Sequence, residues 1–159
     1  MTRALIVGCA GPALSGEERD FLAEASPWGL ILFKRNVVER EQLSALTRTF
    51  REIVGRADAP VLIDQEGGRV QRMGPPHWPA YPAAARFDLE VGGTRALAAA
   101  KLAARLMAHD LAEVGITVDC APDLDVADDA THAVIGTRSY GKDPARVTAL
   151  ARAVVEGLI

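Results

Sequence analysis

The stretch VLIDQEGGRVQR, at Val61–Arg72, combines residue types that bind polar ligands. Three apolar residues lead directly to the carboxylate of Asp64, and two glycines and two arginines follow it. Arg69 and Arg72 are neighbours if the chain forms a short helical turn here, and one guanidinium holds two oxygens of a carboxylate or of vicinal hydroxyls. Glycines permit a sharp turn and the close approach of another molecule. The stretch favours a binding site, with local pairing of Asp64 and an arginine as the structural alternative.

A second group of polar residues follows the apolar run ITVDCAP. Asp123 and Asp125 occur in APDLDV, and Arg138 occurs in IGTRSYG. Both segments belong to one long connection, which we expect on the same side of the fold as Asp64. Aspartates are also common turn residues, and a single arginine is usually solvated, so these residue types alone leave both interpretations open.

The sequence contains no pattern that predicts a metal ion or a cofactor. The three histidines lack ligand spacing, and HExxH, CxxC, P-loop and GxGxxG patterns do not occur. His109 falls in a helical repeat, whereas His77 and His132 fall in long connections from which they could reach a site. We therefore expect neither a cofactor nor a metal.

Composition limits the class of protein. The chain has 159 residues, of which 49% are hydrophobic and 25% charged, as in a soluble globular domain. A net charge of −3 gives no reason to expect a nucleic acid or an anionic membrane as partner. No segment is long enough for a membrane span or a signal peptide. Cys9 and Cys120 lie in apolar runs and are expected to be small buried hydrophobes of a cytoplasmic protein.

These residues must be positioned by a regular alternation of strands and helices. Four short runs are apolar throughout and predict strands: Arg3–Cys9, Trp28–Phe33, Pro60–Asp64 and Ile116–Pro122. Strands of this kind are buried on both faces of a parallel sheet that helices cover. The four units therefore predict the α/β class.

A helical repeat follows each of the four runs. Ser15 and Glu18 form a capping-box pattern before the first helix, and Asp143 followed by Pro144 predicts the start of the last. The remaining helices begin at about Glu39 and after about Gly93. The predicted apolar positions are Phe21, Leu22 and Ala25; Leu43, Leu46, Phe50, Ile53 and Val54; Ala100, Ala104, Met107, Leu111 and Val114; and Val147, Leu150, Ala151, Val154 and Leu158.

The connections favour a barrel over a small doubly wound sheet. Helix-to-strand connections are short, whereas long loops follow the third strand, to about Gly93, and the fourth, to Lys142. Long loops on the carboxyl side of parallel strands are typical of (β/α)8 enzymes. We expect residues 1–159 to form the first half of such a TIM-type barrel. Its first and fourth strands would be open edges, so we interpret the chain as the amino-terminal part of a longer one that continues with strand five.

The motifs LILFKRN, DQEGGRVQR, APDLDV and IGTRSYGKDP resemble one family, in order and with fitting spacing. The chain is similar to the amino-terminal half of bacterial β-N-acetylhexosaminidases of glycoside hydrolase family three, of the peptidoglycan-recycling type. Asp123 departs from this pattern, because an apolar residue is expected there.

The resemblance implies a cytoplasmic enzyme that removes terminal β-linked N-acetylglucosamine from muropeptides by a retaining mechanism. It assigns Asp64, Arg72 and Arg138 to the binding of sugar hydroxyls. The family's acid/base histidine lies in a KH-x-PGHG motif after strand five, and its nucleophilic aspartate follows strand seven; neither segment occurs here. We therefore expect no catalytic residue in this chain, and Glu66 is interpreted as support for the turn.

Two alternatives remain at this point. One is a β-glucosidase of the same family, and the other is a non-catalytic carbohydrate-binding half barrel that dimerises to close its edges. The sequence does not determine the oligomeric state.

Overall fold

The computed structural model describes residues 1–159, which divide into two compact units. The first unit comprises residues 1–64 and 111–119, and the second comprises residues 65–110 and 120–159. The sheet lies in the first unit. Most of the residues proposed for chemistry lie in the second.

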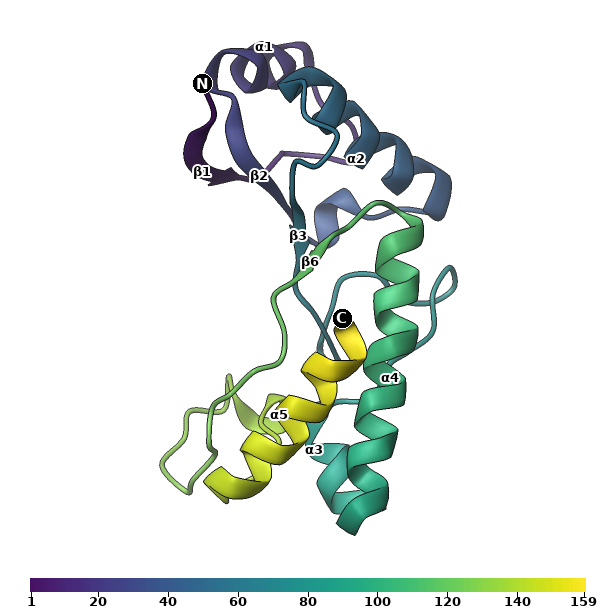
Figure 1. Ribbon diagram of the computed structural model, residues 1–159, viewed down its shortest axis with the longest axis vertical. Coiled ribbons are helices and arrows are strands. Elements are labelled where there is room, and N and C mark those ends of the chain that lie inside the picture. Colours follow the sequence, from purple (N-terminus) through teal and green to yellow (C-terminus); the bar gives the residue numbers. More distant parts are fainter. The chain divides into compact units, whose positions relative to one another are not determined.

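The first unit contains a four-stranded parallel sheet (Figure 1). Its order is β1-β2-β3-β6, formed by Arg3–Val7, Pro27–Leu32, Val61–Ile63 and Val118–Asp119. All four predicted strands are present; β1, β3 and β6 are shorter than their apolar runs, and β2 begins and ends one residue earlier than predicted. The predicted α/β class is confirmed, because strands joined by helices pair in parallel and in sequence order.

Within residues 1–159 the four strands are not equally buried. The side chains of β3 are buried, as are most of those of β2, whereas four of the five residues of β1 are exposed. Leu5 and Ile6 of β1 retain 42% and 49% of their accessible surface. β1 and β6 are the two edges of the sheet, so each has a strand neighbour on one side only.

Two amphipathic helices belong to the same unit. The helix α1, Gly16–Ala25, begins with the predicted capping box, in which the Ser15 hydroxyl accepts from Glu18 N and Glu18 accepts from Ser15 N. The backbone N–H groups of Ser15 and Ala10 both donate to the Glu18 carboxylate and lower its pKa below the ordinary value. The helix α2, Arg40–Val54, buries Leu43, Leu46 and Phe50 of the predicted stripe, whereas Ile53 and Val54 are half-buried.

A buried asparagine connects the segments that follow β1 and β2. Asn36, the last residue of the short helix η1 (Lys34–Asn36), is fully buried. Its Nδ2 donates to Cys9 O at 3.1 Å and to Gly11 O at 2.8 Å, and its Oδ1 accepts from Phe33 N at 2.8 Å. One side chain thereby provides hydrogen-bond partners for backbone groups of two loops.

The two cysteines have different surroundings, and only Cys9 agrees with the sequence interpretation. Cys9 is buried, and burial, together with the nearby charge of Glu18, raises the pKa of its thiol to about 11. Cys120, which directly follows β6, is exposed. We expect a thiol reagent at pH 8 to modify Cys120 quickly and Cys9 slowly, since the thiolate is the reactive form. Mass spectrometry of the time course measures this, and C120S should abolish the fast phase; rapid modification of Cys9 would contradict its burial.

The second unit is built on two helices. The helix α4, Gly93–Glu113, lies against α5, Pro144–Leu158, and its last three residues belong to the first unit (Figure 1). The helices approach so closely that a Cβ at Gly157 would lie 2.3 Å from Lys101 O. The predicted start of α5 is confirmed, because the Asp143 side chain accepts from Ala145 N and Pro144 follows. The core residues of this unit are Ala84, Phe87, Ala96, Ala100, Ala104, Tyr140, Val147, Leu150 and Val154.

The segment from Gln65 to Gly92 is more ordered than the loop predicted for it. It contains an antiparallel hairpin of β4 (Gln65–Gly67) and β5 (Val70–Gln71), the turn α3 (Ala84–Arg86) and the π-helix η2 (Phe87–Val91). Strands of two or three residues are too short to show a hydrophobic period, so the sequence could not reveal them.

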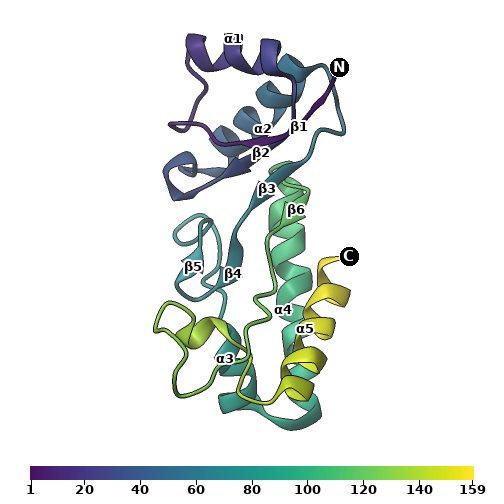
Figure 2. The same ribbon diagram turned by 90° about the vertical axis from the view of Figure 1, so that its left-hand side faces the viewer.

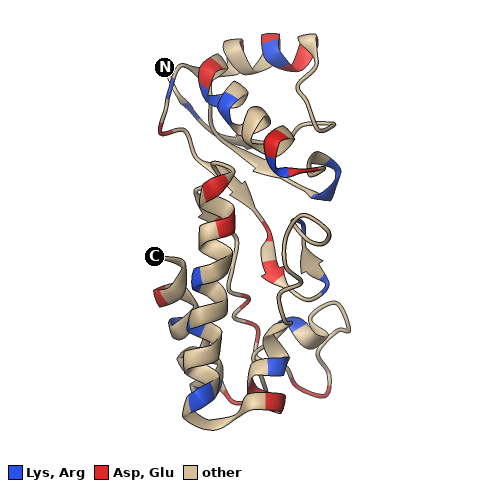
Figure 3. Ribbon diagram, turned by 90° about the vertical axis from the view of Figure 1, so that its right-hand side faces the viewer, with Lys and Arg blue, Asp and Glu red and all other residues tan.

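Charged residues of both signs are interspersed along the helices (Figure 3). None of the helices combines the length and the apolar character that crossing a bilayer requires.

Candidate functional site

The motif DQEGGRVQR forms the β4–β5 hairpin, which begins two residues after β3 ends (Figure 2). The buried side chain of Gln65 fixes the returning strand, because its Oε1 accepts from Arg72 N at 2.9 Å and from Met73 N at 3.0 Å. Its Nε2 donates to Met73 O at 2.8 Å. The short helical turn considered for Arg69 and Arg72 is therefore wrong. Arg69 lies in the hairpin turn, and Arg72 directly follows β5.

The two glycines of the motif are required by the packing of the turn. Gly67 has φ +89°, and a Cβ there would lie 2.4 Å from Pro82 O. A Cβ on Gly68, at φ +58°, would lie 2.6 Å from Ala83 Cβ. Gly68 N donates to Tyr81 O at 2.9 Å, which holds the turn against the segment that begins at Tyr81. This close approach is possible because glycine has no side chain.

Gln71 connects the hairpin to the same stretch of chain. Its Nε2 donates to Pro79 O at 2.7 Å and to Met73 O at 2.7 Å, and its Oε1 accepts from Tyr81 N at 2.9 Å. Both glutamines of the motif thus act on the backbone, and the hairpin is a fixed platform for the charged residues between them.

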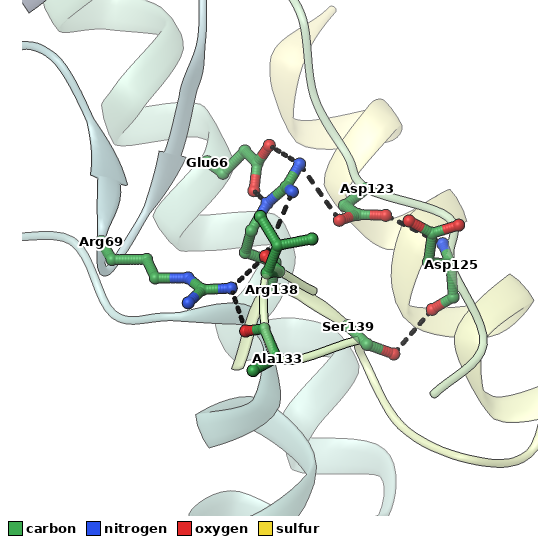
Figure 4. Close-up of polar contacts among 8 residues, drawn as sticks. Glu66, Arg69, Asp123, Asp125, Ala133, Arg138 and Ser139 are labelled. Carbon is green, nitrogen blue, oxygen red and sulfur yellow. Dashed lines mark hydrogen bonds and ion pairs between the residues drawn. The ribbon is translucent and has the colours of Figure 1, made fainter. Parts of the chain in front are cut away.

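The long connection after β6 brings Arg138 to this platform (Figure 4). Arg138 ends the short helix η3, Gly136–Arg138, and makes a two-pronged ion pair with Glu66 of β4. The distances from Nε to Oε2 and from Nη2 to Oε1 are both 2.8 Å. Nη2 also lies 3.2 Å from Asp123 Oδ2. The exposed fractions of the Arg138, Glu66 and Asp123 side chains are 24%, 10% and 6%.

Arg69 joins the hairpin to the same loop, and here the hairpin supplies the arginine and the loop supplies the acceptors. Its Nη2 donates to Ala133 O at 2.9 Å and also to Val134 O (Figure 4). The hairpin therefore holds the loop through Arg69, and the loop holds the hairpin through Arg138.

Asp123 and Asp125 combine the two interpretations that the sequence left open. As a turn residue, Asp123 accepts from Asp125 N at 2.9 Å, and as a charged group it pairs with Arg138. The charge of Asp123 raises the pKa of the neighbouring Asp125 carboxyl. The bonds from Glu66, with the charges of Glu66 and both aspartates, raise the pKa of Arg138 further above its ordinary value, so this guanidinium stays charged.

Ser139 closes the loop behind Arg138. The buried Ser139 Oγ lies 2.6 Å from Asp125 O and accepts from Gly141 N at 3.1 Å. Ser139 follows Arg138 directly in IGTRSYG, so the hydrogen bonds of the Ser139 hydroxyl also restrain the backbone of Arg138.

The residues predicted to bind a ligand follow or end three different elements. Asp64 is half-buried and directly follows β3 in the first unit, whereas Arg72 and Arg138 are half-buried in the second. Their role in binding stays a prediction. His77, His109 and His132 are exposed, and His132 Nδ1 accepts from Val134 N at 3.1 Å within its own turn.

Sequence reasoning missed the partnership of Glu66 with Arg138. The two residues are 72 positions apart, so no local spacing connects them. The sequence offered one signal for this pair. Glu66 is a second carboxylate in the motif after the third strand, and Arg138 has no acidic residue next to it in the sequence. The described residues contain no group of three or more His, Cys, Asp or Glu that could hold a metal ion.

Comparison with known proteins gives one consistent family. Residues 5–159 match the model described as the glycosyl hydrolase family 3 N terminal domain. A Methylococcus capsulatus protein named beta-hexosaminidase is 44% identical over 148 residues, which cover 93% of this chain and 43% of that protein. The chain thus spans about half the length of the curated relatives that it matches.

Solved structures give the same result. One is the crystal structure of NagZ from Neisseria gonorrhoeae in complex with N-trifluoroacetyl-D-glucosamine. Its sequence is 34% identical to that of this chain, and the TM-score is 0.85 over 97% of this chain and 45% of that one. A family 3 beta-N-acetylglucosaminidase from Paenibacillus is 29% identical, with a TM-score of 0.85 over 96% of this chain and 29% of that one. The predicted barrel-type fold is confirmed, with the described sheet as one part of it.

Proposed function

Because the chain belongs to glycosyl hydrolase family 3, we propose that it is the amino-terminal part of a β-N-acetylhexosaminidase, whose barrel continues beyond Ile159. The reaction is the hydrolysis of a terminal β-linked N-acetylglucosamine with retention of configuration. The match with beta-hexosaminidases across almost the whole chain carries this proposal. These relatives support it over the β-glucosidase and the non-catalytic half barrel.

The proposed role of residues 1–159 is to bind the sugar. Asp64 accepts from sugar hydroxyls, and Arg72 and Arg138 donate to sugar oxygens. A hexose presents its hydroxyls at fixed angles, so a carboxylate and planar guanidinium groups on fixed backbone orient the ring for the reaction. The hairpin that Gln65 and Gln71 hold supports this role for Arg72.

The substrate class rests on two observations about relatives. One solved relative contains N-trifluoroacetyl-D-glucosamine, and another is named a beta-N-acetylglucosaminidase. The proposal extends to peptidoglycan fragments as substrates and to the cytoplasm as compartment, on the resemblance of the motifs. The acid/base and nucleophilic residues are expected in the part of the polypeptide that follows Ile159.

Hydrolysis of an aryl β-N-acetylglucosaminide by the complete natural polypeptide tests the proposal. We expect turnover by the complete polypeptide and none by residues 1–159 alone. In the complete polypeptide, Asp64→Ala should lower kcat/KM about 10- to 150-fold, since a hydrogen bond to a charged group contributes about 1.5–3 kcal/mol. Asp58→Ala, which removes an exposed carboxylate of the preceding connection, is the matched control.

Three results would contradict parts of the proposal. Preference for an aryl β-glucoside would favour the alternative enzyme. Turnover by residues 1–159 would place catalytic groups inside this chain. An unchanged kcat/KM for Asp64→Ala would remove that residue from the binding site.

A further inference from the structure

The guanidinium of Arg138 has one edge occupied and one edge nearly unused. Nε and Nη2 are both bonded to Glu66, and Nη2 also pairs with Asp123. Nη1 makes a single contact, with Val134 O at 3.5 Å, which is the outer limit of a hydrogen bond. The Nη1 edge is therefore the edge that can donate to another molecule.

The surroundings of Glu66 make it a firm anchor. Its side chain is 10% exposed, and both of its oxygens bond to Arg138. Its backbone lies in β4, between Gln65, which is bonded to the returning strand, and Gly67, which packs against Pro82. Because a two-pronged pair fixes both the position and the plane of a guanidinium, the orientation of Arg138 is set by the hairpin.

Stability alone does not require such a pair. Burying two carboxylates around one guanidinium has a desolvation cost, and apolar side chains of similar volume are often equally stable. The arrangement does fix one orientation of the arginine, which a ligand site needs.

We propose that Glu66 is a positioning residue, which turns Arg138 so that the Nη1 edge donates to an acceptor oxygen of the saccharide. The inference rests on the proposed function, in which Arg138 binds the sugar. Asp123 stands beside Nη2 and limits rotation of the guanidinium towards that side. The loop supplies the arginine, and the hairpin determines where its free edge points.

A double-mutant cycle in the complete natural polypeptide tests the inference. With an aryl β-N-acetylglucosaminide, Glu66→Gln should lower kcat/KM about 10- to 100-fold, because a misplaced binding group costs rate. Arg138→Lys should have a similar effect, since an ammonium cannot form the two-pronged pair. Adding Glu66→Gln to Arg138→Lys should change kcat/KM less than about twofold, because the two residues act as one unit.

Glu90→Gln is the matched control. Glu90 of η2 makes the same two-pronged pair with Arg86, at 2.7 and 2.8 Å, but both side chains are more than half exposed, and its replacement should leave kcat/KM unchanged. A crystal structure of the complex with N-acetylglucosamine should place a sugar oxygen within hydrogen-bond distance of Nη1, with Glu66 still on Nε and Nη2.

The outcomes separate the inference from the function on which it rests. An inactive wild-type polypeptide would overturn the proposed function, and the positioning role with it. An active wild type with full activity in Glu66→Gln would overturn the positioning role alone. Additive kinetic losses in the double variant, or a sugar oxygen on Nη2, would also overturn it, since Glu66 would then act independently of the Nη1 edge.

Discussion

Replacing Arg138 by Met is expected to lower the free energy of unfolding by about 3 kcal/mol. The change leaves Glu66 and Asp123 without their cation, although their side chains are only 10% and 6% exposed. A carboxylate in such surroundings has lost most of its hydration, so removing its partner costs more than the pair contributes. The value lies at the low end of the range for buried pairs because Arg138 itself is 24% exposed.

Urea unfolding, followed by tryptophan fluorescence, measures this effect, since Trp78 is buried in the same unit. Arg86→Met is the matched control. Arg86 forms an equally short two-pronged pair with Glu90, but both side chains are more than half exposed, so its loss should change the unfolding midpoint very little. Equal effects of the two substitutions would contradict the importance of burial at Glu66 and Asp123.

The regular elements were predictable because their signals are local. The capping box at Ser15, the proline after Asp143 and the apolar stripe of α4 depend on residues within one or two helical turns of each other. Burial of β1 was not predictable in this way. Its apolar composition indicates a covered strand, and the covering of an edge strand depends on which other segments pack against it; within residues 1–159, β1 has a strand neighbour on one side only.

The site could be predicted only in part, for the same physical reason. The glycines and arginines of DQEGGRVQR identify a special turn, but the β4–β5 hairpin is stabilised by side chains that bond to distant backbone, such as Gln71 with Tyr81. The pair of Glu66 and Arg138 joins the β4–β5 hairpin to the connection after β6, and α4 separates these two segments in the sequence. The types of residue in DQEGGRVQR and in the connection after β6 identified both as candidate segments. Only the tertiary contacts showed that the two segments meet.

Replacing Asn36 by Ala is expected to lower the free energy of unfolding by about 3–5 kcal/mol. Asn36 is fully buried, so bulk water does not reach the backbone groups that its amide satisfies. Gly11 O loses the donor Nδ2 and Phe33 N loses the acceptor Oδ1. Each unsatisfied buried group costs about 1–3 kcal/mol, and the vacated volume adds to this. Cys9 O is less affected, because Arg35 Nε also donates to it, at 3.0 Å.

Gln42→Ala is the matched control for this substitution. Gln42 is also an amide bonded to three backbone groups, since its Nε2 donates to Pro12 O and Asn36 O and its Oε1 accepts from Val38 N. It is only half-buried, so water can take its place, and its loss should cost about 1 kcal/mol. Thermal or urea unfolding of the two variants gives the comparison. A cost for Asn36→Ala no larger than that for Gln42→Ala would show that water reaches the loops, and that the buried amide does not join the segments after β1 and β2.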